Sequence, residues 1–237
     1  MQRILFGIGV TVRRLALLAA AAALSGCATL DMPAPLDMDA YTAMYGPLPE
    51  ERFPIPATRI VNVDPKFLRT QVNYETSEHP GTIVIDTSNR FLYLVQEGGM
   101  AMRYGIGVGV AGLELEGAAI IARKAEWPRW TPTQDMIRRN PEVNAKWAGG
   151  MQPGLTNPLG ARALYLHRDG RDTLFRIHGT SEPRSIGKAI SSGCIRLFNQ
   201  DIVDLYRRVP VGAKVVVIQN NVAVSDNSSV SPSDRSL

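Results

Sequence analysis

The stretch TLFRIHGTSEPRSIGKAISSGCIRL, residues 173–197, decides the fold of this chain. Its first part, 173–177, has the composition of a strand, and His178 stands where that strand ends. The run into Cys194 is a second strand-like segment. A histidine at the end of a strand can project its ring into a cleft, so the stretch predicts a sheet with a site beside it.

Short strand-like runs continue on both sides of this stretch, separated by turns such as Pro80-Gly81 and Gly98-Gly99. Turns that recur about every eight to twelve residues, with few helices between them, are typical of a β-sandwich or barrel. The sequence therefore predicts a mainly β domain, a β-sandwich or barrel with a few short helices. The expected strands cover 82–86, 91–95, 102–110, 118–125, 161–166, 173–177 and 214–218.

Three short helices are expected at residues that favour helix starts and stops. A helix over 65–69 would begin after Asp64 as its cap, with proline in the first turn. A helical turn over 134–139 would stop before the following Asn-Pro pair. A helix over 200–208, capped by Asn199, would present an apolar face to the core.

The first 26 residues are typical of an export signal, with three arginines before a short apolar core. That core is too short to span a bilayer as a stable helix. Leu24-Ser25-Gly26-Cys27 then resembles a bacterial lipobox, which implies acylation of Cys27 and a periplasmic, membrane-anchored protein. The residue after it, Ala28, favours the outer membrane by the same resemblance. An ordinary cleaved signal with a chance cysteine is the alternative.

The remaining chain divides into three parts. Residues 27–79 are expected to form a tether and N-terminal extension, because 28–56 is rich in proline and methionine and shows no strand or helix period. Partial docking of this tether on the domain stays open. Residues 80–219 form one domain, and the Ser-, Asp- and Asn-rich end, 220–237, is expected to be a disordered tail.

Charge and composition exclude several function classes. The formal net charge is +4, from 26 Lys and Arg against 22 Asp and Glu. The signal contains three of the arginines and no acid, so the rest is close to neutral. Without a dense basic patch, nucleic acid is not an expected partner. Three histidines and no acidic cluster predict no metal site, and no cofactor is expected.

Cys194 is the only cysteine after the signal and its lipobox cysteine, Cys27, in a compartment that oxidises thiols. Such a thiol is either buried and inert or retained for its reactivity. A nearby imidazole, here His178, would raise its thiolate fraction. The backbone N–H groups of 192–194 could form an oxyanion hole, and Arg196 could clamp a substrate carboxylate. Taken singly, the cysteine could equally be a core residue and the histidine a structural hydrogen-bonder.

The combined pattern is more specific. His178-Gly179-Thr180 followed by Ser191-Ser192-Gly193-Cys194-Ile195-Arg196-Leu197 resembles the active-site signature of the L,D-transpeptidase catalytic domain family, which remodels bacterial peptidoglycan. Segments 80–86, 157–166 and 209–217 extend the resemblance over about residues 80 to 219. Ser192 departs from the pattern, since many relatives have His or Arg there; that position contributes mainly its backbone.

The resemblance implies a role for each residue of the signature. Cys194 would be the nucleophile and His178 its base, with the backbone carbonyl of Gly179 orienting the imidazole. Ser192 and Gly193 would contribute backbone groups to catalysis. Substrate contacts would come from Arg196, Ser191, Thr180 and Trp127. For Trp127 and the loop that follows it, a cluster that caps the core is an equal alternative to a wall over the substrate.

The implied activity is L,D-transpeptidation: Cys194 would form a thioester with a tetrapeptide stem, release D-Ala and pass the acyl group to an amine. That amine could belong to another peptidoglycan stem peptide or to an envelope protein. Two alternatives remain. With water as acceptor the protein would be an L,D-carboxypeptidase or crosslink hydrolase, and without catalysis it would be a peptidoglycan-binding lipoprotein. A redox switch is less favoured, because no resolving cysteine follows the signal.

Overall fold

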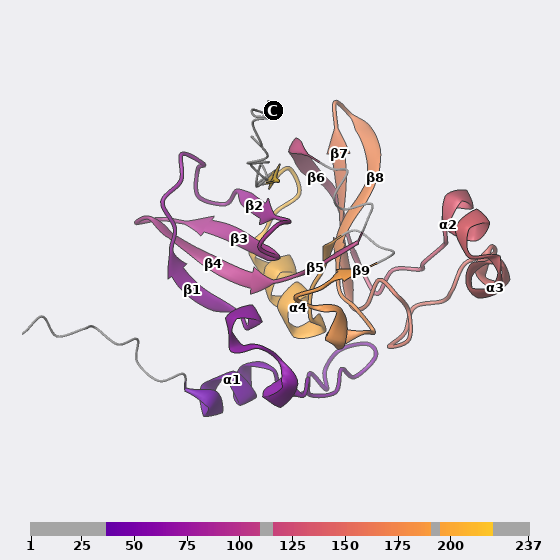
Figure 1. The fold of residues 1–237 in the computed structure, drawn as a ribbon, viewed down its shortest axis with the longest axis horizontal. Helices are drawn as coiled ribbons and strands as arrows, with labels where there is room; N and C mark the ends of the chain where they lie inside the picture. The colour runs from indigo at the N-terminus through magenta and orange to yellow at the C-terminus, as the bar shows by residue number, and fades with distance from the viewer. Residues whose placement is uncertain (1–36, 110–115, 191–194, 220–237) are drawn as a thin grey trace, which may run out of the picture. The chain divides into compact units, whose positions relative to one another are not determined.

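The computed structural model describes residues 37–109, 116–190 and 195–219. Its strands form one eleven-stranded sheet in the order β1-β4-β3-β2-β11-β6-β7-β8-β10-β5-β9. Figure 1 shows β2–β4 running across the view and β6–β8 running up it, so the sheet bends between its two halves. The predicted mainly β class is confirmed. The strands are β1 Thr70–Asn73, β2 Ile83–Asp86, β3 Phe91–Gln96, β4 Met100–Gly105, β5 Gly107–Gly109, β6 Gly117–Glu126, β7 Arg162–Arg168, β8 Arg171–His178, β9 Ala189–Ile190, β10 Ile195–Arg196 and β11 Lys214–Ile218.

The helices are short, as the sequence predicted. In the described part of the chain, none is both long and apolar enough to cross a membrane. The α-helices are α1 Met38–Met44, α2 Gln134–Arg139, α3 Pro141–Asn144 and α4 Asn199–Arg208, and the 3₁₀ turns are η1 Ile60–Asn62, η2 Pro65–Phe67, η4 Ala145–Trp147 and η5 Pro183–Ser185.

Strand β2 shows why this sheet forms where it does. It lies between β3, which is antiparallel to it, and β11, which is parallel. All four of its residues are buried, as expected for an apolar run with a partner on each edge. Helix α4 packs Ile202 and Leu205 into the same core as Ile83 and Val215, which confirms the apolar face predicted for this helix.

The N-terminal segment, residues 37–69, is folded rather than a tether. Tyr45 and Leu68 are fully buried in an apolar cluster with Ile186 and Phe198 of the main domain. Strand β1, immediately after this segment, extends the sheet by pairing with β4. From Asp37 onward the segment docks on the domain, which is the alternative that the sequence left open for the tether. The burial of residues 37–69 depends on partners more than 100 residues away in the sequence, and the local spacing of apolar residues cannot reveal such contacts.

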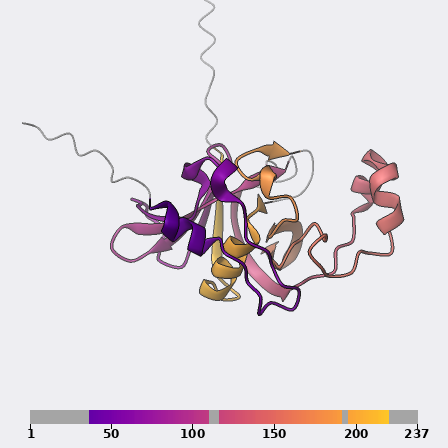
Figure 2. The ribbon, with the colours of Figure 1, turned by 90° about the horizontal axis from the view of Figure 1, so that it is seen from below.

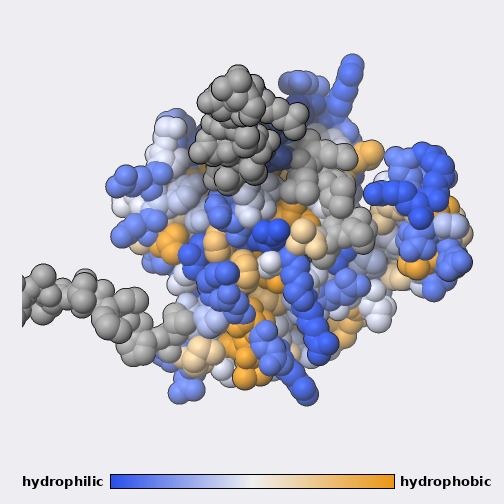
Figure 3. Space-filling view, viewed as in Figure 1, coloured by the Kyte–Doolittle hydropathy of each residue, from blue (hydrophilic) through white to orange (hydrophobic). Residues whose placement is uncertain are grey.

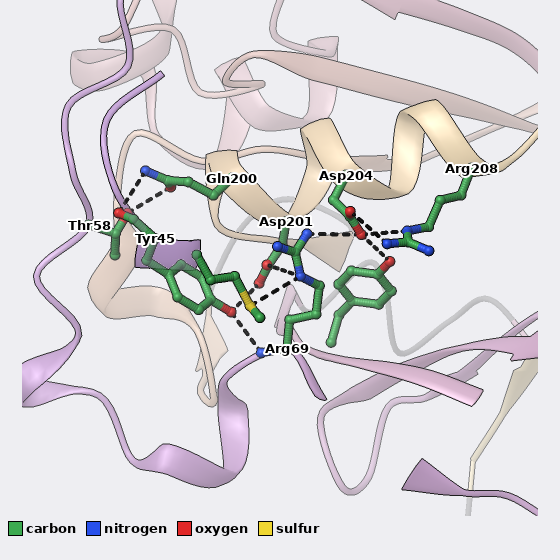
Figure 4. A network of polar contacts seen from close by, with 9 residues as sticks. Tyr45, Thr58, Arg69, Gln200, Asp201, Asp204 and Arg208 are labelled. Atoms are coloured by element: carbon green, nitrogen blue, oxygen red, sulfur yellow. Dashed lines mark hydrogen bonds and ion pairs between the residues drawn. The ribbon is translucent and has the colours of Figure 1, made fainter. Parts of the chain in front are cut away.

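Gln200, at the start of α4, lies beside Thr58 of the N-terminal segment (Figure 4). Its Nε2 donates to the carbonyl oxygens of Gly46 at 3.1 Å and Pro56 at 3.0 Å. Its Oε1 accepts from the Thr58 hydroxyl at 2.8 Å. One amide thus fixes three points of a segment that has little regular structure.

The next residue of α4, Asp201, is fully buried and anchors the same segment. Its Oδ2 accepts from the Tyr45 hydroxyl at 3.0 Å, and its Oδ1 lies 3.8 Å from Arg69 Nε. Arg69 also pairs with Asp204 at 2.9 Å. Burial raises the pKa of Asp201 to about 7, although the Arg69 charge acts in the opposite direction. The cost of burying this carboxylate is therefore only partly offset by its partners.

Residues 128–156 form an arm that carries α2 and α3 away from the sheet (Figures 1 and 2). Buried Asn157 closes its base, because Nδ2 donates to the carbonyl oxygens of Pro128 at 3.1 Å and Gln152 at 3.0 Å. The helical turn predicted over 134–139 is confirmed as α2. A second helix, α3, follows at Pro141, which suits the first helical position.

Candidate active site

Strands β8 and β10 place His178 beside Arg196. The two strands are parallel, with Ile177 opposite Ile195 and His178 opposite Arg196. Both isoleucines lie in the core, so the alternation of side chains along a strand turns His178 and Arg196 toward the other face of the sheet. Four residues of the predicted site and the predicted lipidation site lie outside the described residues: Ser191, Ser192, Gly193, Cys194 and Cys27.

The imidazole of His178 is held in one tautomer. Its Nδ1 lies 2.6 Å from the carbonyl oxygen of Gly179, the contact that the family resemblance implied. A carbonyl can only accept, so Nδ1 carries the proton and Nε2 is left with its lone pair. The side chain is 3% exposed. In this tautomer the basic lone pair of the neutral ring is therefore on Nε2.

The surroundings of His178 also keep it neutral. Burial lowers the pKa of His178 from 6.5 to about 4, and the Arg196 charge adds to that effect. Hydrogen bonds to the backbone of Gly179 and Pro158 act in the opposite direction but do not outweigh burial. A neutral imidazole at pH 7 is the form that can take a proton from a thiol.

Gly179 is fixed by Asn199, the first residue of α4. Asn199 Oδ1 accepts from the backbone N–H of Ala161 at 3.0 Å, and its Nδ2 donates to the carbonyl oxygen of Thr180 at 3.1 Å. A Cβ on Gly179 or on Gly160 would collide with the Asn199 amide. The Asn199 side chain thus occupies a space that is open only because residues 160 and 179 are glycines.

The predicted role of Asn199 as a helix cap is wrong. Phe198 occupies the cap position of α4 and makes no side-chain hydrogen bond there. Asn199 instead bridges the start of β7 and the turn after β8, next to the residue that orients His178. Gly160 and Gly179 were the only signals in the sequence for this close contact.

Arg196 is engaged by a carboxylate. Its Nη1 lies 2.7 Å from Glu182 Oε2, and the two side chains are 11% and 71% exposed. Glu182 was not predicted as a site residue. A substrate carboxylate that binds Arg196 would replace an exposed side chain of the same charge, and exposed ion pairs contribute little stability.

Thr180 and Trp127 have different surroundings. Thr180 is buried, its hydroxyl accepts from the backbone N–H of Glu182 at 2.9 Å, and it lines a cavity next to the site. Trp127 is 3% exposed and packs edge-on against Phe53, and its indole N–H donates to Glu51 Oε2 at 3.0 Å. The packing of Trp127 favours the capping cluster over a wall for the substrate.

The chain resembles known proteins over the region that contains this site. The model of the L,D-transpeptidase catalytic domain family matches residues 80–217. A Fuscovulum blasticum protein named as an L,D-transpeptidase in the ATP synthase subunits region is 39% identical over 138 residues, 57% of this chain and 68% of its own length. ErfK/SrfK of Escherichia coli K12, also named as an L,D-transpeptidase, is 35% identical over 144 residues, 60% of this chain and 45% of its own length.

Among solved structures, a Brucella melitensis protein named as a carnitine operon oxidoreductase is 50% identical, covering 68% of this chain and 99% of that one, with a TM-score of 0.47. Its name differs in class from those of the two relatives above, and the TM-score is too low for an argument about fold. The family model covers more than half of the chain, and the first relative is matched over more than two thirds of its length. The chain therefore belongs to the L,D-transpeptidase catalytic domain family.

Proposed function

We propose that the protein is a peptidoglycan L,D-transpeptidase that works through a thioester on Cys194. Its donor would be a tetrapeptide stem and its acceptor an amine, on a second stem or on an envelope protein. The observation that carries this proposal is the state of His178: neutral, buried, and bonded through Nδ1 to the Gly179 carbonyl, which puts the basic lone pair on Nε2. Cys194 immediately precedes Ile195, which pairs with Ile177 beside that histidine.

In the first half-reaction, His178 Nε2 takes the thiol proton, and the Cys194 sulfur attacks the carbonyl carbon after the L-centre of diaminopimelate. Backbone N–H groups around Gly193 would stabilise the oxyanion of the tetrahedral intermediate. The C–N bond then breaks, and the imidazolium returns the proton to the leaving nitrogen of D-Ala. A thioester remains on Cys194.

In the second half-reaction, an amine attacks the thioester carbonyl, its proton passes to His178 Nε2, and the C–S bond breaks. The new amide joins donor and acceptor, and the proton returns to the Cys194 sulfur. Arg196 would bind a donor carboxylate in place of Glu182 during this cycle. Acylation of Cys27 would hold the enzyme at a membrane facing the periplasm, which supports action on the cell wall.

The test is intact-mass spectrometry of the protein with a disaccharide-tetrapeptide, alone and with an acceptor stem. We expect an adduct equal to the donor minus alanine, absent from Cys194→Ala, that resolves to a crosslinked dimer. An adduct that resolves only to tripeptide assigns the protein as a hydrolase. Release of D-Ala by Cys194→Ala contradicts the proposal, as does the absence of any adduct on a Cys194 that is also slow toward a small alkylating agent.

A further inference from the structure

A cavity of about 880 Å³ lies between the N-terminal segment and the residues that follow the catalytic strand. One wall comes from residues between 55 and 67, and the other from residues 180, 181, 183, 184, 186–188 and 198–200, with Leu155 beside them. We call it the extension groove. The first wall lies outside residues 80–217, so the region matched by the family model does not build this groove alone.

The extension groove begins at the candidate active site. Thr180, which lines it, is two residues after His178, and its carbonyl oxygen accepts from Asn199. Asn199 and Gln200 also line the groove. The residues that position the site and the residues that hold the N-terminal segment therefore share one surface of this cavity.

The charged residues of the groove are mostly basic. Arg59, Arg184 and Lys188 line it and are exposed. The ion pairs found between described residues include none of these three. Among the described residues that line the groove, the only acid is Asp64, which pairs with Lys66 at 3.1 Å. An anionic ligand is therefore favoured.

The walls between these cations are partly apolar. Ile55, Ile186 and Phe198 are buried side chains that contribute to the lining. In Figure 3, apolar and charged side chains alternate on the lower part of this face, where Figure 1 places the N-terminal segment. The volume lies within the range of about 300–1,000 Å³ that is usual for ligand sites. An extended peptide with carboxylates at intervals fits this chemistry.

We propose that the extension groove binds the acceptor peptide of the second half-reaction through its carboxylates. The inference rests on the proposed function, because only a reaction that joins two peptides needs a second peptide site. The donor occupies the side of η5 that faces Arg196, where Glu182 now lies. Thr180, which lines the groove, is two residues after His178, and we place the acceptor amine on that side of the site.

The experiment compares the full chain carrying Arg184→Glu and Lys188→Glu with one carrying Arg171→Glu and Arg207→Glu, two exposed arginines outside the groove. Each is given the tetrapeptide donor with a carboxylate-bearing stem peptide or with glycinamide, a neutral amine. The measured quantity is the ratio of transfer product to released D-Ala. We expect this ratio to fall about tenfold or more for the stem peptide in the groove variant, in line with the effect of opposed charges at a binding surface.

Glycinamide transfer should keep its ratio in both variants, and the control variant should behave as the unsubstituted chain. An unchanged ratio for the stem peptide in the groove variant overturns the inference, and so does an equal fall with glycinamide. If the unsubstituted chain releases no D-Ala, the proposed function fails instead. Fluorescence anisotropy of a labelled stem peptide then tests the groove without turnover: salt-sensitive binding lost only in the groove variant supports it, and equal binding by both variants contradicts it.

Discussion

At the scale of single residues, burial of His178 links the active site to the stability of the fold. Its pKa is 6.5 in the unfolded chain and about 4 in the folded one. Between these values the unfolded chain binds the proton more readily. The stability that the neutral ring provides is therefore complete above pH 6.5 and is lost as the pH falls through about 4. At about 1.4 kcal/mol for each pH unit, the loss approaches 3 kcal/mol.

Urea unfolding at pH 7 and pH 4 tests this link with His178→Gln, which does not titrate. On acidification the free energy of unfolding should fall by about 2–3 kcal/mol less in the variant than in the unsubstituted chain. Asp201, whose pKa burial raises to about 7, acts in the opposite direction over the same range. Because that group is present in both chains, the comparison cancels it. An identical pH dependence in the two chains would show that His178 is not held neutral.

Asn199 is the second residue whose substitution should change the active site. Asn199→Ala leaves the Ala161 N–H and the Thr180 carbonyl without their partner and removes the side chain that packs against Gly179, which then keeps only its backbone hydrogen bond to Arg162 on that side. Since small misplacements of catalytic groups cost much activity, kcat for D-Ala release should fall about tenfold to hundredfold with little change in KM. Asn199→Asp keeps the acceptor for the Ala161 N–H, so its kcat should lie between those of Asn199→Ala and the unsubstituted chain.

A positioning role makes a second readout necessary. The imidazole Nδ1 proton of His178 should broaden or shift in the NMR spectrum of Asn199→Ala, because its acceptor on Gly179 is no longer fixed. Asn140→Ala removes another asparagine, on the arm, where its side chain accepts from Val143. That control should leave both kcat and the resonance unchanged. Normal activity with a sharp, unshifted resonance in Asn199→Ala would contradict the positioning role of Asn199.

The residues that the sequence predicted and those it missed differ in how local their contacts are. His178 and Gly179 are neighbours, so the motif itself implied their hydrogen bond. Asn199 was expected to cap its own helix, the usual role of asparagine at that position. It bonds instead to Ala161 and Thr180, 38 and 19 residues away. Only the packing of β7 against α4 brings these groups together.

At the scale of elements, strands were predictable from the sequence where an apolar run has a neighbouring strand on each side. Strand β11, for example, was expected with the bounds that the structure shows. Helix α1 and strand β1 were not. Helix α1 contains no buried residue, and the segment around it is fixed by contacts that begin on α4. A pattern of single residues cannot predict an element that is held by partners far along the chain.

Gln200 is the residue on which that attachment can be tested. Gln200→Ala removes the partner of the carbonyl oxygens of Gly46 and Pro56 and of the Thr58 hydroxyl in a partly buried place, at a cost of about 1 kcal/mol. Hydrogen exchange should therefore rise in peptides from 37–69 while β7 and β8 stay protected. Gln134→Ala, on the exposed face of α2, is the matched control. Exchange that rises equally throughout the domain would contradict a local role.

At the scale of the whole molecule, the region matched by the family model is not a complete folding unit in this chain. Glu51, outside that region, accepts from Trp127 and pairs with Arg162 at 2.7 Å. Both partners of this ion pair are largely buried, with side chains 9% and 7% exposed. Removing one member of a buried pair leaves an uncompensated charge, which costs about 3–5 kcal/mol.

Two shortened chains test this dependence. A chain that starts at Asp37 keeps Glu51, Tyr45 and Arg69, and should unfold at nearly the same temperature as the full chain. A chain that starts at Thr70 leaves Asp201 buried without Tyr45 and Arg69, leaves Arg162 with only the 3.7 Å contact to Glu126 among its described acidic partners, and exposes the cluster around Phe198. Because domains are stable by only about 5–15 kcal/mol, losses of this size should leave it largely unfolded at 37 °C. Circular dichroism melts and urea titrations measure both. If the two chains were equally stable, the N-terminal segment would not contribute to the stability of the domain. The extension groove would then be lined on one side by a segment that the fold does not require.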